Sequence, residues 1–205
     1  MVDERRRVPK DDLLTALVQA ELEGSRLSFD ELLAMLILLL VAGNETTTNL
    51  IGNAALELLA HPDALRAVRA DPSLVPGAIE EVLRFSSPVQ MDPRLAVRNV
   101  EVQGTIIPAG EFVLCWLGAA NRDEAVFERP ETFDVRREKQ NHVAFGFGPH
   151  YCLGASLATL EAQVAVRVLV ARTRAFRRTN EEPLPMHPSI VFRGVTSLPM
   201  VLDPA

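Results

Sequence analysis

The chain has 205 residues, of which 48% are hydrophobic, and its 27 acidic and 21 basic side chains give a formal net charge of -6. This length suits one globular domain, the hydrophobic content excludes a disordered chain, and two cysteines are too few for a disulfide framework. The negative charge argues against nucleic acid or a membrane surface as a partner. The amino terminus is charged from Asp3 onward and no apolar segment follows, so we expect no secretion signal and a cytoplasmic protein.

Two helices are predicted near the amino terminus. Residues 11–23 begin with two acidic side chains and are followed by Gly24, a natural stop, which predicts one short helix. A capping box at residues 28–31 begins a second helix of about 32 residues, because no helix breaker follows before Pro62. Its first half is apolar on every side, so we expect it to run through the middle of a protein body. Its apolar run is too short to span a bilayer.

Further helices and short strands follow. Prolines at the favoured first position predict helices over residues 62–70 and 76–86. Residues 89–116 are rich in β-branched side chains and turn signals, which favours short strands. After a charged meander at residues 121–142, the apolar spacing of residues 153–172 predicts a helix. Short apolar runs near the carboxy terminus favour strands, so the expected fold class is mainly α with small β-sheets.

The segment from Phe145 to Gly154 is a glycine-rich loop with a cysteine at the threshold of a helix. The positive end of the helix dipole favours a thiolate, so Cys152 is placed to be a nucleophile or a soft metal ligand. The glycines let the backbone approach a flat cofactor closely. A zinc site lacks ligand-pair spacing and a fourth partner, and a phosphate loop lacks its lysine. A simply buried cysteine and a nucleophile pair with His150 remain open.

A polar segment, residues 42–48, interrupts the apolar part of the long helix. Gly43 lowers the helix propensity, the threonines can bond back to the preceding turn, and the Glu45 carboxylate is costly to bury without a partner. A sequence tolerates such a segment when a ligand lies alongside the helix. The alternative is a polar patch facing solvent, for which the apolar flanks leave little room.

Two arginine features complete the set of candidate residues. Glu81 and Arg84 are three residues apart and share one helical face, where most such pairs are solvated and contribute little stability. Arg94 lies on a strand-like run. A lone arginine there is equally compatible with an ordinary surface position.

Taken in chain order, the acid–threonine helix, the Glu-x-x-Arg helix, the strand arginine and the cysteine loop resemble the cytochrome P-450 family. The loop matches that family's haem-binding signature, Phe-x-x-Gly-x-His-x-Cys-x-Gly. The resemblance implies that the cysteine ligates haem b as a thiolate, which favours O–O cleavage in a monooxygenase that uses O2 to oxidise a small apolar organic substrate. The defining positions of the loop are Phe145, Gly148, His150, Cys152 and Gly154.

The resemblance assigns the polar segment of the long helix to proton delivery. Glu45 and Thr46 are similar to the acid–alcohol pair that delivers protons to iron-bound dioxygen, and Ala42 and Gly43 would open the helix groove. Splitting O2 requires protons at a buried oxygen, so a hydroxyl and a carboxylate beside the iron make chemical sense.

The resemblance gives structural and cofactor-binding roles to the charged residues. Glu81 and Arg84 match the family's Glu-x-x-Arg helix, and Arg137 resembles the third member of its Glu-Arg-Arg cluster. This cluster would lock the meander beneath the haem and keep the carboxylate paired. Arg94 and His150 resemble the partners of the haem propionates, where charge-assisted hydrogen bonds are expected.

Other parts of the resemblance concern the electron donor and the substrate. The run Asn-Arg-Asp at residues 121–123 and the Leu-Leu-Val-Ala-Gly run are similar to the soluble bacterial branch, which takes electrons from a ferredoxin and its reductase. The expected substrate pocket favours an apolar molecule. The residues expected to line it are Val89, Gln90, Met91, Val191 and Phe192.

The resemblance covers nearly all of residues 1–205 but only the carboxy-terminal half of the family's fold. We therefore expect a single truncated cytochrome P-450 domain without its amino-terminal half, with apolar area of the long helix left exposed. Two interpretations follow. Either the residues keep their monooxygenase roles in a full-length context, or the product is a non-catalytic remnant that binds haem weakly or serves only as an interaction partner.

Overall fold

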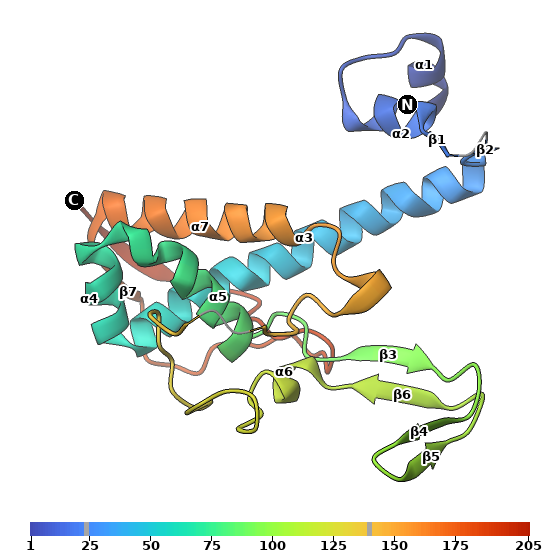
Figure 1. Ribbon diagram of the computed structural model, residues 1–205. Coiled ribbons are helices and arrows are strands. Elements are labelled where there is room, and N and C mark those ends of the chain that lie inside the picture. The colour runs from blue at the N-terminus through green and yellow to red at the C-terminus, as the bar shows by residue number, and fades with distance from the viewer. Residues whose placement is uncertain (23–24, 139–140) are drawn as a thin grey trace. The chain divides into compact units, whose positions relative to one another are not determined.

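The computed structural model describes residues 1–22, 25–138 and 141–205, and Figure 1 shows the chain coloured by residue number. The described residues form two compact units, Met1–Glu45 and Thr46–Ala205, and we treat each by itself. Helices make up most of the regular structure, and each sheet in the described ranges has two strands. The predicted fold class, mainly α with small sheets, is confirmed.

The first unit differs from its prediction. The predicted helix over residues 11–23 is too long, because Ala20 leaves helical geometry with ψ 131° and a strand follows. The predicted stop, Gly24, lies outside the described residues. One helix of this unit is not among the predicted ones. The elements are α1 (Val2–Arg7), α2 (Leu13–Gln19) and the antiparallel strands β1 (Glu21–Leu22) and β2 (Ser25–Arg26).

Helix α3 (Phe29–Ala60) begins at the predicted capping box. The Ser28 backbone N–H donates to Glu31 Oε2 at 2.8 Å, and the Glu31 N–H donates to Ser28 Oγ at 3.3 Å. The bond from the Ser28 backbone holds the pKa of Glu31 below its ordinary value. These bonds satisfy amides that a helix N-terminus leaves unpaired. They confirm the predicted start of the helix and its length of 32 residues.

The two halves of α3 differ in burial. Leu50 and Leu58 are 1% exposed and belong to the core of the second unit. In the first unit, Ile37, Leu40 and Val41 are 54%, 72% and 60% exposed. The expectation that the first half of the helix is buried is therefore wrong, because the described elements of its unit leave these side chains uncovered. Their exposure agrees instead with the apolar area expected of an incomplete domain.

The core of the second unit lies where four helices pack together (Figure 1). Helix α4 (Pro62–Ala70) has the predicted bounds. Helix α5 (Val75–Phe85) begins and ends one residue earlier than predicted and carries Pro76 in its first turn. Helix α7 (Ala155–Arg172) and the second half of α3 complete the core. The buried cluster includes Ala54, Leu58, Val68, Ile79, Val82, Ala162 and Val166.

Short antiparallel strands flank this core, and those predicted over residues 89–116 are confirmed. β3 (Asp92–Leu95) pairs with β6 (Phe112–Cys115), and β4 (Val100–Val102) pairs with β5 (Thr105–Ile107). Gln103 and Gly104 both have positive φ, 49° and 78°, as a tight turn between β4 and β5 requires. β7 (Thr173–Arg178) follows α7 directly and pairs with β8 (Met200–Pro204). Helix α6 (Leu117–Ala120) is not among the predicted elements.

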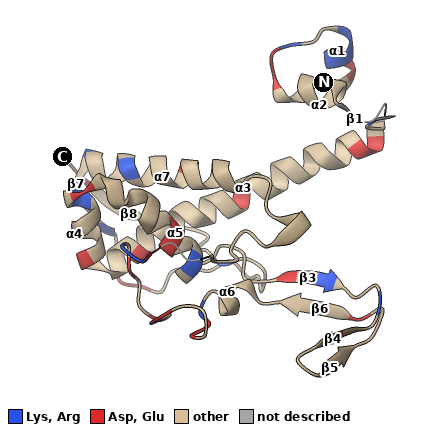
Figure 2. Ribbon diagram, in the orientation of Figure 1, with Lys and Arg blue, Asp and Glu red and all other residues tan. Residues whose placement is uncertain are grey.

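Helix α7 has apolar side chains on opposite faces. One face enters the core, whereas Leu157, Leu160, Val164 and Val168 remain 47% to 58% exposed. Figure 2 shows that charged residues are few along this helix. The unit therefore leaves an apolar helix face uncovered. Within the described ranges, no helix is both long enough and apolar enough to cross a membrane.

Candidate functional site

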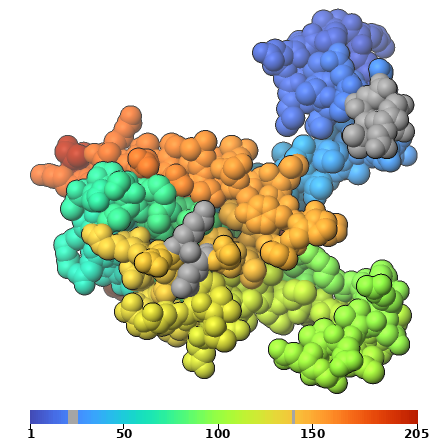
Figure 3. Space-filling model, in the orientation of Figure 1, coloured from blue at the N-terminus to red at the C-terminus, as the bar shows by residue number. Residues whose placement is uncertain are grey.

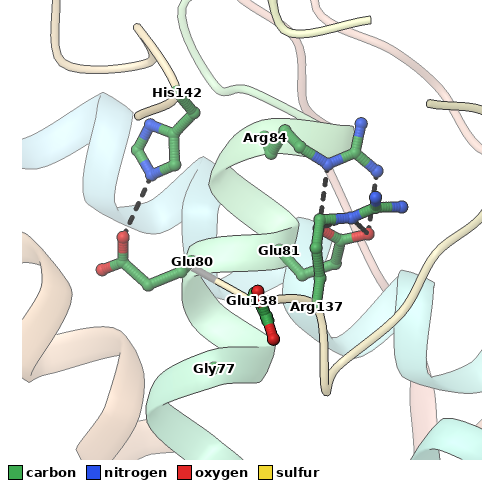
Figure 4. Close-up of a pocket in the computed structure, with 7 residues that line it drawn as sticks. All are labelled: Gly77, Glu80, Glu81, Arg84, Arg137, Glu138 and His142. Atoms are coloured by element: carbon green, nitrogen blue, oxygen red, sulfur yellow. Dashed lines mark hydrogen bonds and ion pairs between the residues drawn. The ribbon is translucent and has the colours of Figure 1, made fainter. Parts of the chain in front are cut away.

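A buried carboxylate with two arginines lies where α5 meets the meander (Figure 4). Arg84 Nε and Nη2 donate to the two carboxylate oxygens of Glu81 at 2.8 Å each, and Arg137 Nε lies 3.1 Å from Glu81 Oε2. The side chains of Glu81 and Arg84 are each 2% exposed, which rules out a solvated surface pair. The structure therefore brings together Glu81, Arg84 and Arg137, three residues from two chain segments.

The two guanidinium groups also hold the backbone of the meander. Arg84 Nη1 donates to the carbonyls of Asn121 at 3.0 Å and Pro130 at 2.9 Å, and Arg84 Nη2 donates to Thr132 O at 3.1 Å. Arg137 donates to carbonyls within residues 128–132. Buried charges are tolerated when their hydrogen bonds are satisfied. The cluster thus fastens a segment without regular structure to α5.

Cys152 lies in a loop that closes on itself before α7. Its backbone N–H donates to Phe145 O at 3.0 Å, and the Ala155 N–H donates to Cys152 O at 3.3 Å. Gly146 and Gly148 have φ values of 75° and 78°, a region that side chains disfavour. Cys152 is exposed, and Figure 3 shows this part of the chain in orange at the surface.

The surroundings of Cys152 fit a flat apolar cofactor. Phe147 and Leu153 are 86% and 85% exposed, and Tyr151 is 55% exposed. A Cβ at Gly148 or Gly154 would meet no atom within 4 Å, so the backbone borders open space. In the described part of the chain, no group of three His, Cys, Asp or Glu side chains could hold a metal ion. A single thiolate suits an iron whose other ligands come with a cofactor.

The structure separates the two alternatives for Cys152. Its exposure rules out a simply buried cysteine. His150 lies in the 3-10 turn Gly148–His150 and is exposed as well. Within residues 141–205 the structure shows no hydrogen bond between the His150 ring and the Cys152 thiol, so its geometry gives no support to the nucleophile pair.

The polar segment of α3 includes the end of the first unit and the start of the second. Ala42 and Gly43 are exposed, and Glu45 is half-buried. Thr46 is half-buried and follows Glu45 directly in the helix. A Cβ at Gly43 would meet no atom within 4 Å, so this position borders open space. The exposure of Ala42 and Gly43 is compatible with both alternatives, a polar patch that faces solvent and a segment that faces a ligand.

Arg94 lies on β3 and is exposed. Its Nη1 lies 2.5 Å from Asp92 Oδ1 and donates to Pro93 O at 2.9 Å. The hydrogen bond with Asp92 raises the pKa of Arg94 above its ordinary value. The guanidinium stays charged and keeps donors on its exposed side, so it remains accessible to an anionic ligand.

The predicted pocket residues come together from two segments about 100 residues apart in the chain. Val89 and Phe192 form an antiparallel bridge, and the Gln90 N–H donates to Val191 O at 2.7 Å. Gln90 Nε2 donates to Ser87 O at 2.6 Å, so its side-chain amide is already engaged. The fifth expected residue, Met91, is buried with 6% exposure.

Sequence reasoning assigned no role to Ser87, Asn121 or His142, although the side chains of all three form hydrogen bonds within the second unit. Asn121 has no exposed surface. The run Asn-Arg-Asp marks its position in the sequence, but the burial of an asparagine depends on contacts with residues far along the chain. Such contacts are invisible to motif and periodicity arguments.

Known proteins are similar to this chain over almost its whole length. The family model Cytochrome P450 matches residues 2–196. Cytochrome P450 107B1 of Saccharopolyspora erythraea is 51% identical over 202 residues, which cover 98% of this chain and 50% of the relative. Cytochrome P450 monooxygenase PikC of Streptomyces venezuelae is 45% identical over 203 residues, which cover 98% of this chain and 49% of the relative.

Solved structures agree with the sequence matches. Cytochrome P450 CYP109Q5 from Chondromyces apiculatus superposes with a TM-score of 0.95 at 45% identity, over 100% of this chain and 53% of that chain. The chain thus spans about half the length of the curated relatives it matches. The family match includes the polar segment of α3, the buried Glu-Arg-Arg cluster and the cysteine loop. The chain belongs to the cytochrome P-450 family, whose members are haem-thiolate monooxygenases.

Proposed function

We propose that this chain is the carboxy-terminal half of one cytochrome P-450 domain and carries the haem-thiolate site of a monooxygenase. The single observation behind the proposal is the exposed Cys152 in a glycine-shaped loop before α7. The match to about half the length of each relative supports the half-domain part, as does the uncovered apolar face of α7.

Cys152 would ligate the iron of haem b as a thiolate. When bound, haem supplies the chemistry of O2 activation, and a thiolate ligand favours O–O cleavage. Phe145 closes the loop by accepting the Cys152 backbone N–H. Gly148 and Gly154 leave the open space that a flat macrocycle needs near the thiol.

Two further contacts with haem are assigned on chemical grounds. Arg94 and His150 are exposed and would bind the two propionates through charge-assisted hydrogen bonds. Ala42 has a small side chain and Gly43 has none, and both are exposed on α3, so they would leave room for a ligand beside the helix.

Glu45 and Thr46 would deliver protons. Transfer of one oxygen atom from O2 to a substrate releases the other as water, which consumes two protons and two electrons. The Thr46 hydroxyl can donate a proton, and the Glu45 carboxyl next to it in α3 can replace that proton. The cluster of Glu81, Arg84 and Arg137 would act structurally, because its groups bond to the meander.

The proposed substrate is a small apolar organic molecule. The bridge between Val89 and Phe192 places apolar residues from two segments beside each other, and one N–H of the Gln90 amide is already donated to Ser87 O. The two electrons would come from a ferredoxin-type donor. The residues proposed to line the pocket are Val89, Gln90, Met91, Val191 and Phe192.

A second candidate function has one specific observation in its favour. Apolar side chains stay exposed on α3 and α7, for example Leu40 at 72% and Leu157 at 58%. Such surfaces suit an interaction partner rather than a working enzyme. In this alternative the chain is a non-catalytic remnant that binds haem weakly or acts only through association.

The test compares the chain alone with a chimera in which the amino-terminal half of Cytochrome P450 107B1 precedes it. Both are reduced in the presence of haem and CO, and the difference spectrum is recorded. We expect a thiolate-type Soret band in the chimera. Cys152→Ala should abolish this band, whereas Cys115→Ala, at the other exposed cysteine, should leave it unchanged.

Three outcomes separate the candidates. A band that survives Cys152→Ala contradicts the assignment of the ligand. A chimera with the band that oxidises testosterone, used as a rigid apolar probe, in an O2-dependent reaction supports the monooxygenase. A chimera that folds but forms no thiolate-type band favours the remnant.

A further inference from the structure

Asn121 is fully buried, with 0% of its surface exposed, and begins the meander after α6. All four of its polar groups have partners. Its backbone N–H donates to Leu117 O at 2.9 Å, and its carbonyl accepts from Arg84 Nη1 at 3.0 Å. In the side chain, Oδ1 accepts from the Val143 N–H at 2.8 Å and Nδ2 donates to Ser87 Oγ at 2.9 Å.

The partners determine which way the Asn121 amide points. The Val143 backbone N–H can only donate, so it must face Oδ1. Ser87 Oγ donates its own hydrogen to Leu83 O at 2.6 Å, which leaves a lone pair to accept from Asn121 Nδ2. An asparagine, with one acceptor and one donor group, satisfies both neighbours at once.

Val143 stands at the entry to the Cys152 loop. Its carbonyl accepts from the Gly146 N–H at 2.9 Å, and two residues after it Phe145 O accepts from the Cys152 N–H at 3.0 Å. Asn121 therefore joins the closed loop to Arg84 of the ion cluster and to the end of α5.

A second anchor of this segment is the pair of His142 and the more exposed Glu80, which Figure 4 shows facing each other. His142 Nε2 lies 3.2 Å from Glu80 Oε2, and the Ala144 N–H donates to His142 Nδ1 at 3.3 Å. The Glu80 side chain is 38% exposed, so water can replace a lost bond there. At Asn121 no surface is exposed, so losing its Oδ1 leaves the Val143 amide without a substitute.

We propose that Asn121 is a positioning residue that holds the Cys152 loop in place relative to the Glu81, Arg84 and Arg137 cluster. The inference rests on the proposed function, because the loop matters through its thiolate. A metal ligand binds well when the residues behind it keep it in one geometry. Asn121 bonds only to protein groups and acts through the loop.

Hydrogen exchange of the full 205-residue chain without haem tests the anchor directly. Asn121→Leu keeps the approximate size but removes both side-chain bonds. We expect amides of residues 143–152 to exchange about tenfold faster in this variant, while β7 and β8 exchange as in the unsubstituted chain. Asn121→Asp keeps an acceptor for Val143, and the Ser87 hydroxyl can rotate to donate to the second oxygen. Because this variant buries a carboxylate and takes the Ser87 hydroxyl from Leu83 O, it should exchange faster than the original but clearly slower than Asn121→Leu.

The haem-loaded chimera supplies the second readout, which is the thiolate-type band of its CO difference spectrum. Asn121→Leu should convert most of the thiolate-type band into a form without thiolate ligation, and Asn121→Asp, which keeps the acceptor for Val143, should retain a larger part of the band. Glu80→Gln, at the exposed anchor, should change the band little. This pattern separates positioning from general stability. If the substitutions only destabilised the protein, the loss of the thiolate-type band would correlate with the unfolding midpoint of each variant.

The outcomes separate the anchor from the proposed function. Equal exchange of residues 143–152 in the original chain and in Asn121→Leu overturns the positioning role. If residues 143–152 exchange faster in Asn121→Leu but the unsubstituted chimera forms no thiolate-type band, the anchor stands and the proposed haem site fails. If the band forms and Asn121→Leu leaves both readouts unchanged, the anchor alone fails.

Discussion

The Glu81 cluster and the Cys152 loop lie in the same unit, but the chain completes only one of them. The carboxylate of Glu81 is 2% exposed and bonds to both arginines and to the Asp134 backbone N–H. Around Cys152, by contrast, Phe147 and Leu153 are about as exposed as side chains can be, at 86% and 85%. The cluster needs nothing from outside the chain, whereas the loop presents a surface that a ligand would cover.

This contrast connects energetics with function. Buried charges must be paired inside the protein, so the cluster is satisfied before any ligand arrives. Exposed apolar groups cost free energy in water, and binding a flat apolar cofactor recovers it. The cluster is therefore fully paired within the chain, whereas the loop keeps exposed apolar surface that a bound cofactor would cover.

Replacing Glu81 by alanine should have the largest effect. The change leaves two buried guanidinium groups without their carboxylate, which we expect to lower the free energy of unfolding by about 3–5 kcal/mol. Urea unfolding followed by circular dichroism measures the loss. The matched control is Glu131→Ala, because Glu131 is 77% exposed and pairs with Arg122 at the surface. Its cost should stay below about 1 kcal/mol, and equal costs would contradict the role of burial.

Two helical glycines, Gly77 beside the meander and Gly52 in α3, differ in how closely other segments approach them. A Cβ at Gly77 would lie 2.8 Å from the Val135 carbonyl oxygen, where α5 meets the meander. We therefore expect Gly77→Ala to destabilise the chain by about 1–3 kcal/mol in the same urea experiment. A Cβ at Gly52 of α3 would meet no atom of a neighbouring segment within 4 Å, so Gly52→Ala should stabilise by roughly 0.5–1 kcal/mol. Similar changes in the free energy of unfolding for the two variants would contradict the close contact between Gly77 and the Val135 carbonyl oxygen.

Thr46→Ala tests the proposed proton path in the haem-loaded chimera. Haem binding should be unchanged, because the substitution leaves the cysteine loop intact. Product formed per electron pair should fall about tenfold and peroxide should rise, since a hydroxyl that donates a proton is lost. Thr48→Ala, at an exposed position on the same helix, is the control. Unchanged coupling in Thr46→Ala would remove Thr46 from the proton path.

The smallest effect is expected on the open face of α7. Leu160 is 56% exposed, so Leu160→Gln in the chain alone should change the free energy of unfolding by less than about 0.5 kcal/mol. In the chimera the same change should cost about 1–2 kcal/mol if the added half covers this face. A chimera that tolerates Leu160→Gln as well as the chain alone does would argue against the half-domain proposal.

Elements with local signals could be predicted well. The capping box from Ser28 to Glu31 sets the start of α3 through bonds within one turn, and Pro62 sets the start of α4 because its fixed φ suits the first helical position. The helix predicted over residues 11–23 failed at its end, where no strong stop precedes Gly24 and the chain turns into a two-residue strand instead. Short strands of this kind depend on a partner rather than on their own composition.

The sequence by itself determined α3, α4, the cysteine loop and the family, because these depend on spacing within short segments, whereas α1 and α6 escaped prediction. The tertiary structure decided that Glu81 is buried rather than solvated, that Gln90 donates to Ser87, and that Asn121 bonds to Ser87 and Val143. These partners lie up to tens of residues apart, and no local pattern specifies which distant group satisfies a buried donor. Burial removes water as a substitute, so the folded chain alone selects each partner.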